Sequence, residues 1–229
     1  MKKVIKIILI ILGVLLLIFA VMVGVAIVEE QKLDEIVADL INHEEVDMTI
    51  KMKGTYGTIE KMIKIDYKKI YELSNKIATE YNNPIIEKCL SAKNYQSDGP
   101  LFTNTRKEFE ELKEARKKIT DKMLVIVSDK EAKKRIKEYK LDEFDAEVYN
   151  RYVGQLRIYV NDLVDEDEKL NDVLDNVIVV LDFLGENKDK WKIEGENIIF
   201  DNQDLLDKYN WLTVSSKLCT NCKEDVPSA

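Results

Sequence analysis

The sequence is poor in glycine and proline, with eight and three residues respectively in a chain of 229. Loop-rich all-β folds and disordered low-complexity chains use more of both, so neither class fits. Apolar residues make up 45% of the chain and charged residues 34%, which leaves enough apolar surface for a core. We therefore expect a mainly α protein built from long helices.

Histidine is almost absent, because His43 in the segment NHEEVD is the only one. A serine hydrolase usually needs a base, commonly histidine, beside its nucleophile. The HExxH zinc motif is not formed, because Asp47 stands where its second histidine would be. We interpret His43 as an exposed polar residue near a helix end. No G-x-S-x-G, P-loop or G-x-G-x-x-G motif occurs either, so serine hydrolysis and nucleotide chemistry are poorly supported.

An excess of basic residues is also missing. The part of the chain after Val28 contains 32 of the 35 lysines and arginines and all 43 acidic residues, a net charge of −11. A nucleic-acid backbone is itself an anion and attracts basic surfaces. The composition therefore argues against a nucleic-acid partner.

One long apolar run is present, IILIILGVLLLIFAVMVGVAIV, from Ile7 to Val28. As a helix it would be about 33 Å long, against a hydrocarbon core of about 30 Å. A cleaved signal peptide is the alternative, since Gly24-x-Ala26 offers small residues for a peptidase. Signal-peptide apolar cores are usually shorter, about 7 to 15 residues, so we favour an uncleaved membrane anchor. No cysteine directly follows the run, so a lipoprotein anchor is excluded.

The flanks of this run predict its orientation. Three lysines precede it and Glu29 and Glu30 follow it directly. Because basic residues stay on the cytoplasmic side, residues 1–6 are predicted to be a cytoplasmic tail and residues 7–28 a single-pass anchor in the cell membrane. Everything after the anchor is expected to be extracytoplasmic.

A juxtamembrane helix and hinge are expected over residues 29–58. The helix is indicated by apolar residues at helical spacing, namely Leu33, Ile36, Val37, Leu40 and Ile41. The stretch from Val46 to Thr58 alternates apolar and polar residues and ends in two glycines, which indicates a short extended piece and a turn, or a hinge.

A helical extracytoplasmic domain is expected over residues 59–212. Its first half is predicted to contain a helix from about Ile59 to Tyr81, a short helix around Ile85 to Leu90, and a loop from Asn94 to Pro100. Capping boxes are predicted to start two further helices, at Thr105-x-x-Glu108 and at Ser128-x-x-Glu131. The run LVIV, residues 124–127, could be helix or strand by periodicity alone.

The strongest helical periodicity lies between Leu141 and Leu184. It is interrupted by the acidic segment DEDEK, Asp165 to Lys169, which we interpret as a tight connection between two antiparallel helices. The surrounding segment, Asp162 to Asp172, has enough oxygen ligands to suggest Ca²⁺. An EF-hand needs glycine at its sixth position, however, and Leu170 stands there, so a charged turn is the better interpretation.

A short β-hairpin and a last helix are predicted near the C-terminus. The segment WKIEGENIIF, Trp191 to Phe200, reads as two strands around Gly195, and Asp201 or Asn202 would cap a helix over Gln203 to Tyr209. The pattern Trp191, Ile193, Gly195, Ile198, Phe200, Leu205 or Leu206, and Tyr209-Asn210 resembles the C-terminal end of some uncharacterised bacterial proteins with an N-terminal anchor and a helical exported domain. The resemblance covers about 20 of the 229 residues and implies topology, not chemistry.

The pair Cys219-x-x-Cys222 lies in the expected C-terminal tail, residues 213–229. A thioredoxin-type pair should open a helix after a strand, and a structural zinc site would have to recruit both Cys89 and His43. Export favours oxidation, so we favour a small Cys219–Cys222 disulfide loop. Free thiols, a metal or redox role, and pairing with Cys89 are the alternatives.

Our leading functional hypothesis is a membrane-anchored, non-enzymatic binding or interaction module of the bacterial cell envelope, with an envelope protein or cell-wall partner and no cofactor or metal. One alternative is an accessory or sensory subunit of a membrane complex. The other is a carboxylate-based hydrolase, although Glu108, Glu110, Glu111 and Glu114 lie among basic residues as on a solvated helix face. Several of the ten tyrosines could instead line a groove for sugar or peptide; the sequence does not decide which face they occupy.

Overall fold

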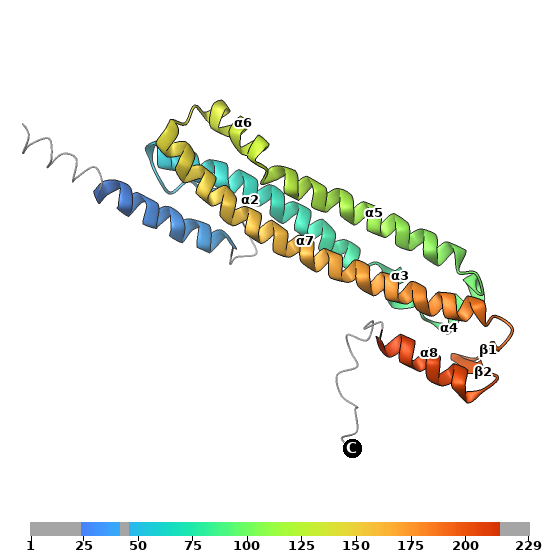
Figure 1. Cartoon of the computed structure of the whole chain (residues 1–229). Coiled ribbons are helices and arrows are strands. Elements are labelled where there is room, and N and C mark those ends of the chain that lie inside the picture. The colour runs from blue at the N-terminus through green and yellow to red at the C-terminus, as the bar shows by residue number, and fades with distance from the viewer. Residues whose placement is uncertain (1–23, 42–45, 216–229) are drawn as a thin grey trace, which may run out of the picture. The chain divides into compact units, whose positions relative to one another are not determined.

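The computed structural model describes residues 24–41 and 46–215 (Figure 1). They form a helical bundle followed by one short antiparallel hairpin, which confirms the mainly α fold with a C-terminal hairpin. Residues 24–41 are helical. The later helices are α2 (Gly54–Tyr81), α3 (Pro84–Lys88), α4 (Ala92–Asp98), α5 (Thr103–Ile126), α6 (Asp129–Tyr139), α7 (Glu143–Glu186) and α8 (Gln203–Ser215). The strands β1 (Trp191–Glu194) and β2 (Asn197–Phe200) lie between α7 and α8.

Most of the predicted membrane span, Ile7 to Val28, lies outside the described residues, and only its end from Gly24 onward is seen, as helix. Within the described part of the chain, no helix is both long enough and apolar enough to cross a bilayer. His43 also lies outside the described residues.

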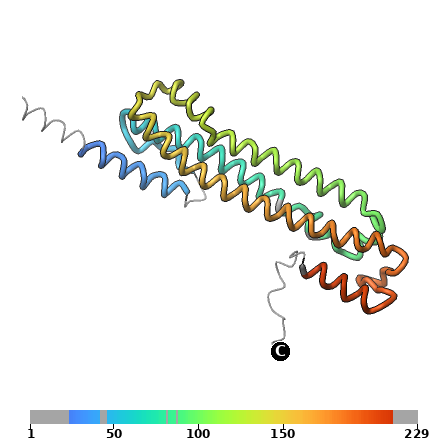
Figure 2. The backbone as a smooth tube through the Cα atoms, in the orientation of Figure 1, coloured from blue at the N-terminus to red at the C-terminus, as the bar shows by residue number. Residues whose placement is uncertain are grey.

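The chain divides into two compact units. Unit 1 contains the described residues up to Ile70 together with Ile126–Arg157, and unit 2 contains Tyr71–Val125 together with Ile158 onward. The boundaries of the units fall within α2 and α7, so each of these helices contributes residues to both units. The backbone trace in Figure 2 shows both as long, continuous helices.

In unit 1, the helix over residues 24–41 contributes most of its predicted apolar stripe to the core, although Ile36 is half-buried and Ile41 is exposed. Leu33, Val37 and Leu40 are buried. The helix is also joined to α7, because Arg151 Nη2 donates to Glu30 Oε2 at 2.9 Å and Tyr152 Oη donates to Asp34 Oδ1 at 2.6 Å. The other buried apolar side chains of this unit come from α2, α6, α7 and the segments beside them, namely Met52, Ile59, Met62, Ile63, Tyr67, Ile70, Val127, Ala132, Val148, Tyr149, Tyr152, Val153 and Leu156.

The segment from Val46 to Thr58, predicted as an extended piece with a turn or as a hinge, is helical only from Gly54 onward. Residues 46–53 carry no regular secondary structure, and α2 begins at Gly54, whose φ is +61°. Gly57 lies in the first turn of α2, where a Cβ atom would stand 2.6 Å from the carbonyl oxygen of Met52. The glycine therefore permits the incoming chain to pass against the start of the helix.

In unit 2, the core is mostly aromatic and aliphatic. It joins α3 and α4, the first half of α5 and the end of α7 to the hairpin and α8. Trp191 Nε1 donates to the carbonyl oxygen of Leu184 at 2.8 Å, and the hydroxyls of Tyr95 and Tyr209 lie 2.9 Å apart. The hairpin register pairs Trp191 with Phe200 and Ile193 with Ile198, so that the inward residues alternate as predicted.

Two predicted connections are wrong, because both segments are helical. Residues Asn94 to Asp98 belong to α4, whose N-cap Ser91 accepts a hydrogen bond from Asn94 N.

The predicted capping box at Thr105 is also wrong: α5 begins at Thr103, and the carboxylate of Asp98 accepts bonds from Asn104 N at 3.0 Å and Thr105 N at 2.7 Å. The cap therefore comes from a side chain outside α5.

The second wrong connection is Asp165 to Lys169, which lies inside the single 44-residue helix α7. The segment contains no glycine or proline to stop a helix. Leu163 and Leu170 are seven residues apart, so the apolar register continues through it, with Asp167 at the intervening buried position.

Other boundaries agree with the sequence. Ser128 is the N-cap of α6 and accepts from Glu131 N at 3.3 Å, which confirms the second capping box. Asn202 accepts from Leu205 N at 3.0 Å at the start of α8, although that helix extends to Ser215 instead of ending at Tyr209. The ambiguous run at residues 124–127 is helical through Ile126.

Candidate functional site

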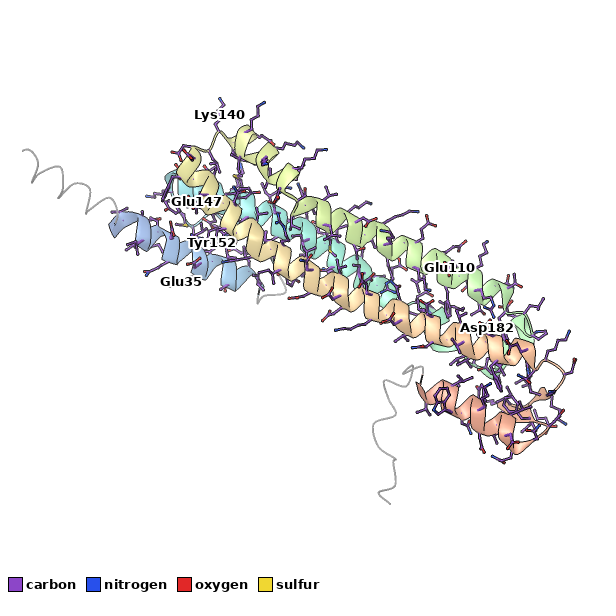
Figure 3. The ribbon with its side chains drawn as sticks, in the orientation of Figure 1. Glu35, Glu110, Lys140, Glu147, Tyr152 and Asp182 are labelled. Carbon is purple, nitrogen blue, oxygen red and sulfur yellow. The ribbon has the colours of Figure 1, made fainter. Side chains whose placement is uncertain are left out.

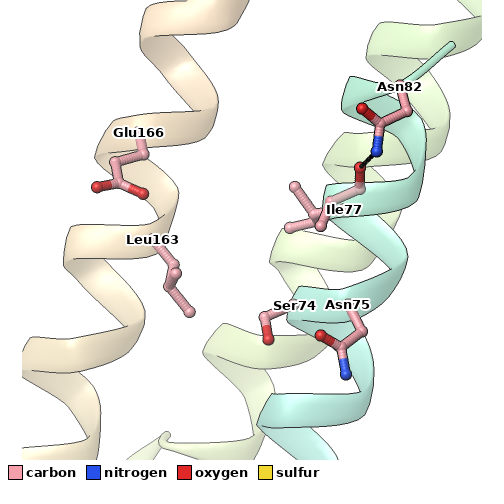
Figure 4. Close-up of a pocket in the computed structure, with 7 residues that line it drawn as sticks. Ser74, Asn75, Ile77, Asn82, Leu163 and Glu166 are labelled. Atoms are coloured by element: carbon pink, nitrogen blue, oxygen red, sulfur yellow. Dashed lines mark hydrogen bonds between the residues drawn. The ribbon is translucent and has the colours of Figure 1, made fainter. Parts of the chain in front are cut away.

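A groove of about 350 Å³ in unit 2 lies between the last turns of α2 and the middle of α7 (Figure 4). Its lining is drawn from both helices and comprises Ser74, Asn75, Ile77, Ala78, Asn82, Leu163 and Glu166. Ile77 is buried and Leu163 half-buried, whereas Asn75, Ala78 and Asn82 are exposed. The groove therefore has an apolar floor and a polar, accessible rim.

The polar side chains of the rim keep hydrogen-bonding capacity for a ligand. Ser74 Oγ donates to the carbonyl oxygen of Tyr71 at 2.9 Å, and Asn82 Nδ2 donates to that of Ala78 at 3.2 Å. Each of these side chains retains oxygen lone pairs that can accept a further bond. Glu166 supplies a carboxylate and no basic side chain lines the groove, so the lining carries a negative charge.

Buried ionic clusters are the second group of features, and the sequence did not predict them. In unit 1, Glu60 and Lys64 are both fully buried, with Lys64 Nζ 2.7 Å from Glu60 Oε1. Glu60 also accepts hydrogen bonds from the backbone N–H groups of Lys51 and Met52, and Lys64 donates to the carbonyl oxygen of Thr49 at 2.6 Å. Burial favours the neutral acid, but Lys64 and the two N–H groups outweigh it and hold the pKa of Glu60 below its usual value. The cluster fixes the extended segment before α2.

The second cluster of unit 1 joins α2, α6 and α7. Asp66 Oδ2 accepts from Arg135 Nη1 at 2.5 Å and from the hydroxyl of Tyr149 at 2.7 Å. The other oxygen, Asp66 Oδ1, has no partner among the described residues. Burial raises the pKa of Asp66 to about 6, despite the opposing effects of Arg135 and Tyr149.

Unit 2 contains one such cluster, between α5 and α7. Arg116 is fully buried; its Nη2 lies 2.6 Å from Asp167 Oδ1, and its Nη1 donates to Asn171 Oδ1 at 3.3 Å. Two further ion pairs connect the same helices near the surface, Arg106 with Asp182 at 2.5 Å and Lys113 with Asp175. These charges serve to pair the two helices.

Of the cysteines and the histidine that the sequence singled out, Cys89 alone lies among the described residues. Cys219 and Cys222 are outside the described residues. Cys89 is buried in the core of unit 2, where desolvation raises the pKa of its thiol to about 11. No group of three or more potential metal-ligating side chains occurs in the part of the chain that the structure describes.

The tyrosines have mainly structural positions. Tyr67, Tyr149 and Tyr152 are buried in unit 1, and Tyr71, Tyr139 and Tyr159 are half-buried. None of these six lines the groove. Comparison of the chain with protein-family models, with curated proteins and with solved structures found no significant match.

Proposed function

We propose that the protein is a non-enzymatic interaction module of the cell envelope. In this proposal Ile7 to Val28 tether it to the membrane, and the groove of unit 2 binds a short segment of a partner polypeptide.

The observation that carries this proposal is the chemistry of the groove. Ile77 and Leu163 offer an apolar surface for one side chain of the partner, and Ser74, Asn75 and Asn82 offer hydrogen bonds for its backbone. A short segment with one apolar side chain therefore fits this lining.

Three buried carboxylates are unavailable to the hydrolase alternative. Glu60, Asp66 and Asp167 are between 0% and 4% exposed, and each is held by a cation of its own unit. A substrate cannot reach these three groups without opening the bundle.

Site-specific crosslinking in intact cells tests the proposal. A photo-crosslinking residue at Asn75, on the groove rim, should give an adduct of defined mass with one partner. The same residue at Lys118, exposed on α5 and outside the groove, should not. Equal adducts from both positions, or none from Asn75, would contradict the proposal.

A pair of charged variants sharpens this test. Ala78→Arg places a cation in the groove and should abolish the Asn75 adduct. Thr79→Arg adds the same charge at an exposed neighbour that does not line the groove, and should leave the adduct unchanged. Circular dichroism of both variants checks that the fold is retained.

The tether is tested separately. A membrane-impermeant maleimide should label Cys219 or Cys222 in intact, reduced cells, with Cys89 remaining unlabelled because it is buried. Labelling only after the membrane is broken would show that the proposed topology is wrong.

A further inference from the structure

A second cavity, in unit 1, has a different lining and a volume of about 540 Å³. It lies where the helix over residues 24–41 meets the first turns of α7. The residues around it are Glu30, Phe144, Glu147, Val148, Asn150 and Arg151. Figure 3 labels Glu147 and Tyr152 on α7 and Glu35 on the helix over residues 24–41.

The charge of this cavity is negative. The only basic residue in its lining, Arg151, is bound to Glu30 at 2.9 Å, and its guanidinium lies 5.3 Å from the centre of the Tyr152 ring. Glu147 is exposed and forms no ion pair with the described residues. The lining therefore retains one uncompensated carboxylate.

The surroundings of the cavity add to this negative charge. Burial raises the pKa of Tyr56, and Glu30 and Asp145 raise it further. Burial and the neighbouring Asp142 raise the pKa of Asp145. Burial is the larger cause of both shifts, and the neighbouring carboxylates add to it.

An exposed aromatic ring stands beside the free carboxylate. Phe144 is 55% exposed although it lies one turn from buried Val148. An aromatic face attracts a cation, and the ring also offers apolar contact to the methylene stem of a long basic side chain. Phe144 and Glu147 are three residues apart on a helix, so they present ring and carboxylate on one face.

We propose that this cavity binds a lysine or arginine side chain of a partner polypeptide, with the charged group on Glu147 and the stem against Phe144. The net charge of −11 beyond Val28 favours the approach of a basic partner. This site is independent of the groove in unit 2, because the two share no residue.

Fluorescence anisotropy of the full-length protein in detergent micelles tests the site. The probe is a fluorescein-labelled peptide of alternating lysine and glycine, and a peptide of alternating glutamate and glycine is the negative control. Glu147→Gln and Phe144→Ala should each weaken binding of the basic peptide by roughly two- to fivefold, the range expected for one exposed ion pair or cation–π contact.

Matched controls separate the cavity from diffuse attraction. Glu143→Gln removes the same charge from an exposed position one turn away and outside the cavity, and Met48→Ala removes an exposed apolar side chain of the same unit. Both should change the affinity less than 1.5-fold.

Three results would overturn the inference. They are equal weakening by Glu143→Gln and Glu147→Gln, no binding of the basic peptide, and complete displacement of the peptide by spermidine at the same total amine concentration. The last result would assign the cavity to small amines instead of a polypeptide.

Discussion

The two units differ in what they bury. Unit 1 encloses four charged side chains, Glu60, Lys64, Asp66 and Arg135, in two clusters that each connect separate segments. Among its described residues, unit 2 encloses one ion pair, two threonines and otherwise a mainly aromatic and aliphatic core. Buried charges need a partner in a defined position, whereas apolar contacts need only complementary volume. The stability of unit 1 should therefore be sensitive to changes of charge and pH. The stability of unit 2 should be sensitive to substitutions that create cavities.

The largest expected effect is from breaking an ion pair in unit 1. Arg135→Met leaves Asp66 buried without its cation and should lower the free energy of unfolding by about 3 to 5 kcal/mol. Lys134→Met, at an exposed neighbour, should change it by less than about 0.5 kcal/mol. Urea denaturation followed by circular dichroism measures both. If the two variants are equally stable, the cluster does not contribute to the stability of unit 1.

A truncation in the apolar core of unit 2 tests the other side of the comparison, the effect of a cavity on stability. Leu181→Ala, at a fully buried position on α7, should lower the free energy of unfolding by about 3 kcal/mol through lost contacts and a cavity. Val179→Ala, two residues away and 48% exposed, is the control and should cost much less. Similar losses in both variants would show that the predicted core face of α7 is wrong.

The pH dependence of unit 1 gives a smaller effect. The pKa of Asp66 is raised from 3.8 to about 6, so the folded state holds this proton more tightly than the unfolded state. Its contribution to stability is present below pH 3.8 and is lost as the pH rises through about 6. The stability of the wild type relative to the double variant Asp66→Leu/Arg135→Met should therefore fall by on the order of 2 kcal/mol between pH 4 and pH 7.

The double variant cancels the titration of all other groups, so the difference reports Asp66 alone. A flat difference between pH 4 and pH 7 would show that Arg135 and Tyr149 fully offset the cost of burying the carboxylate. A difference that rises with pH would show that the pKa is lowered instead.

The smallest expected effects come from two glycines of unit 1. Gly57→Ala brings a Cβ atom to 2.6 Å from Met52 O and should destabilise the protein by about 1 kcal/mol or more. Gly154→Ala lies in α7, where the new Cβ would meet no atom of another segment within 4 Å, and should stabilise the protein by about 0.5 to 1 kcal/mol. In thermal unfolding, the two substitutions should shift the midpoint temperature in opposite directions. Shifts of the same sign would contradict the close approach at Gly57.

The hairpin and most helices could be predicted from the sequence because their signals are local. Trp191 to Phe200 alternates around Gly195, whose φ of +66° favours glycine, and Ser128 caps α6 within one turn. Residues Asn94 to Asp98 have turn composition, but the Ser91 cap and the buried contacts of Tyr95 make them helical. Here tertiary contacts decide the structure.

Two of the three ionic clusters could not be predicted, because Arg116 and Asp167 lie 51 residues apart in the chain and Asp66 and Arg135 lie 69 apart. Glu60 and Lys64 are four residues apart, a spacing that is common in exposed pairs and does not reveal that this pair is buried. Asp167 was interpreted as part of a solvated turn, and only its partner Arg116, 51 residues earlier, explains an acid in the buried register of α7. The only sign of this pair in the sequence is that each of two predicted helices has a charged residue at a position of its apolar stripe. The groove of unit 2 and the cavity of unit 1 likewise depend on which helices meet, which periodicity does not specify.

Both tryptophans of the chain, Trp191 and Trp211, belong to unit 2. The indole of Trp191 is hydrogen-bonded to Leu184 O beside the core, whereas Trp211 is 66% exposed. Intrinsic indole emission is thus a built-in spectroscopic reporter of one half of the molecule, in which Trp191 senses the hairpin and Trp211 the solvent. A denaturation curve from this emission, compared with one from circular dichroism of all helices, reveals directly whether the two units unfold together.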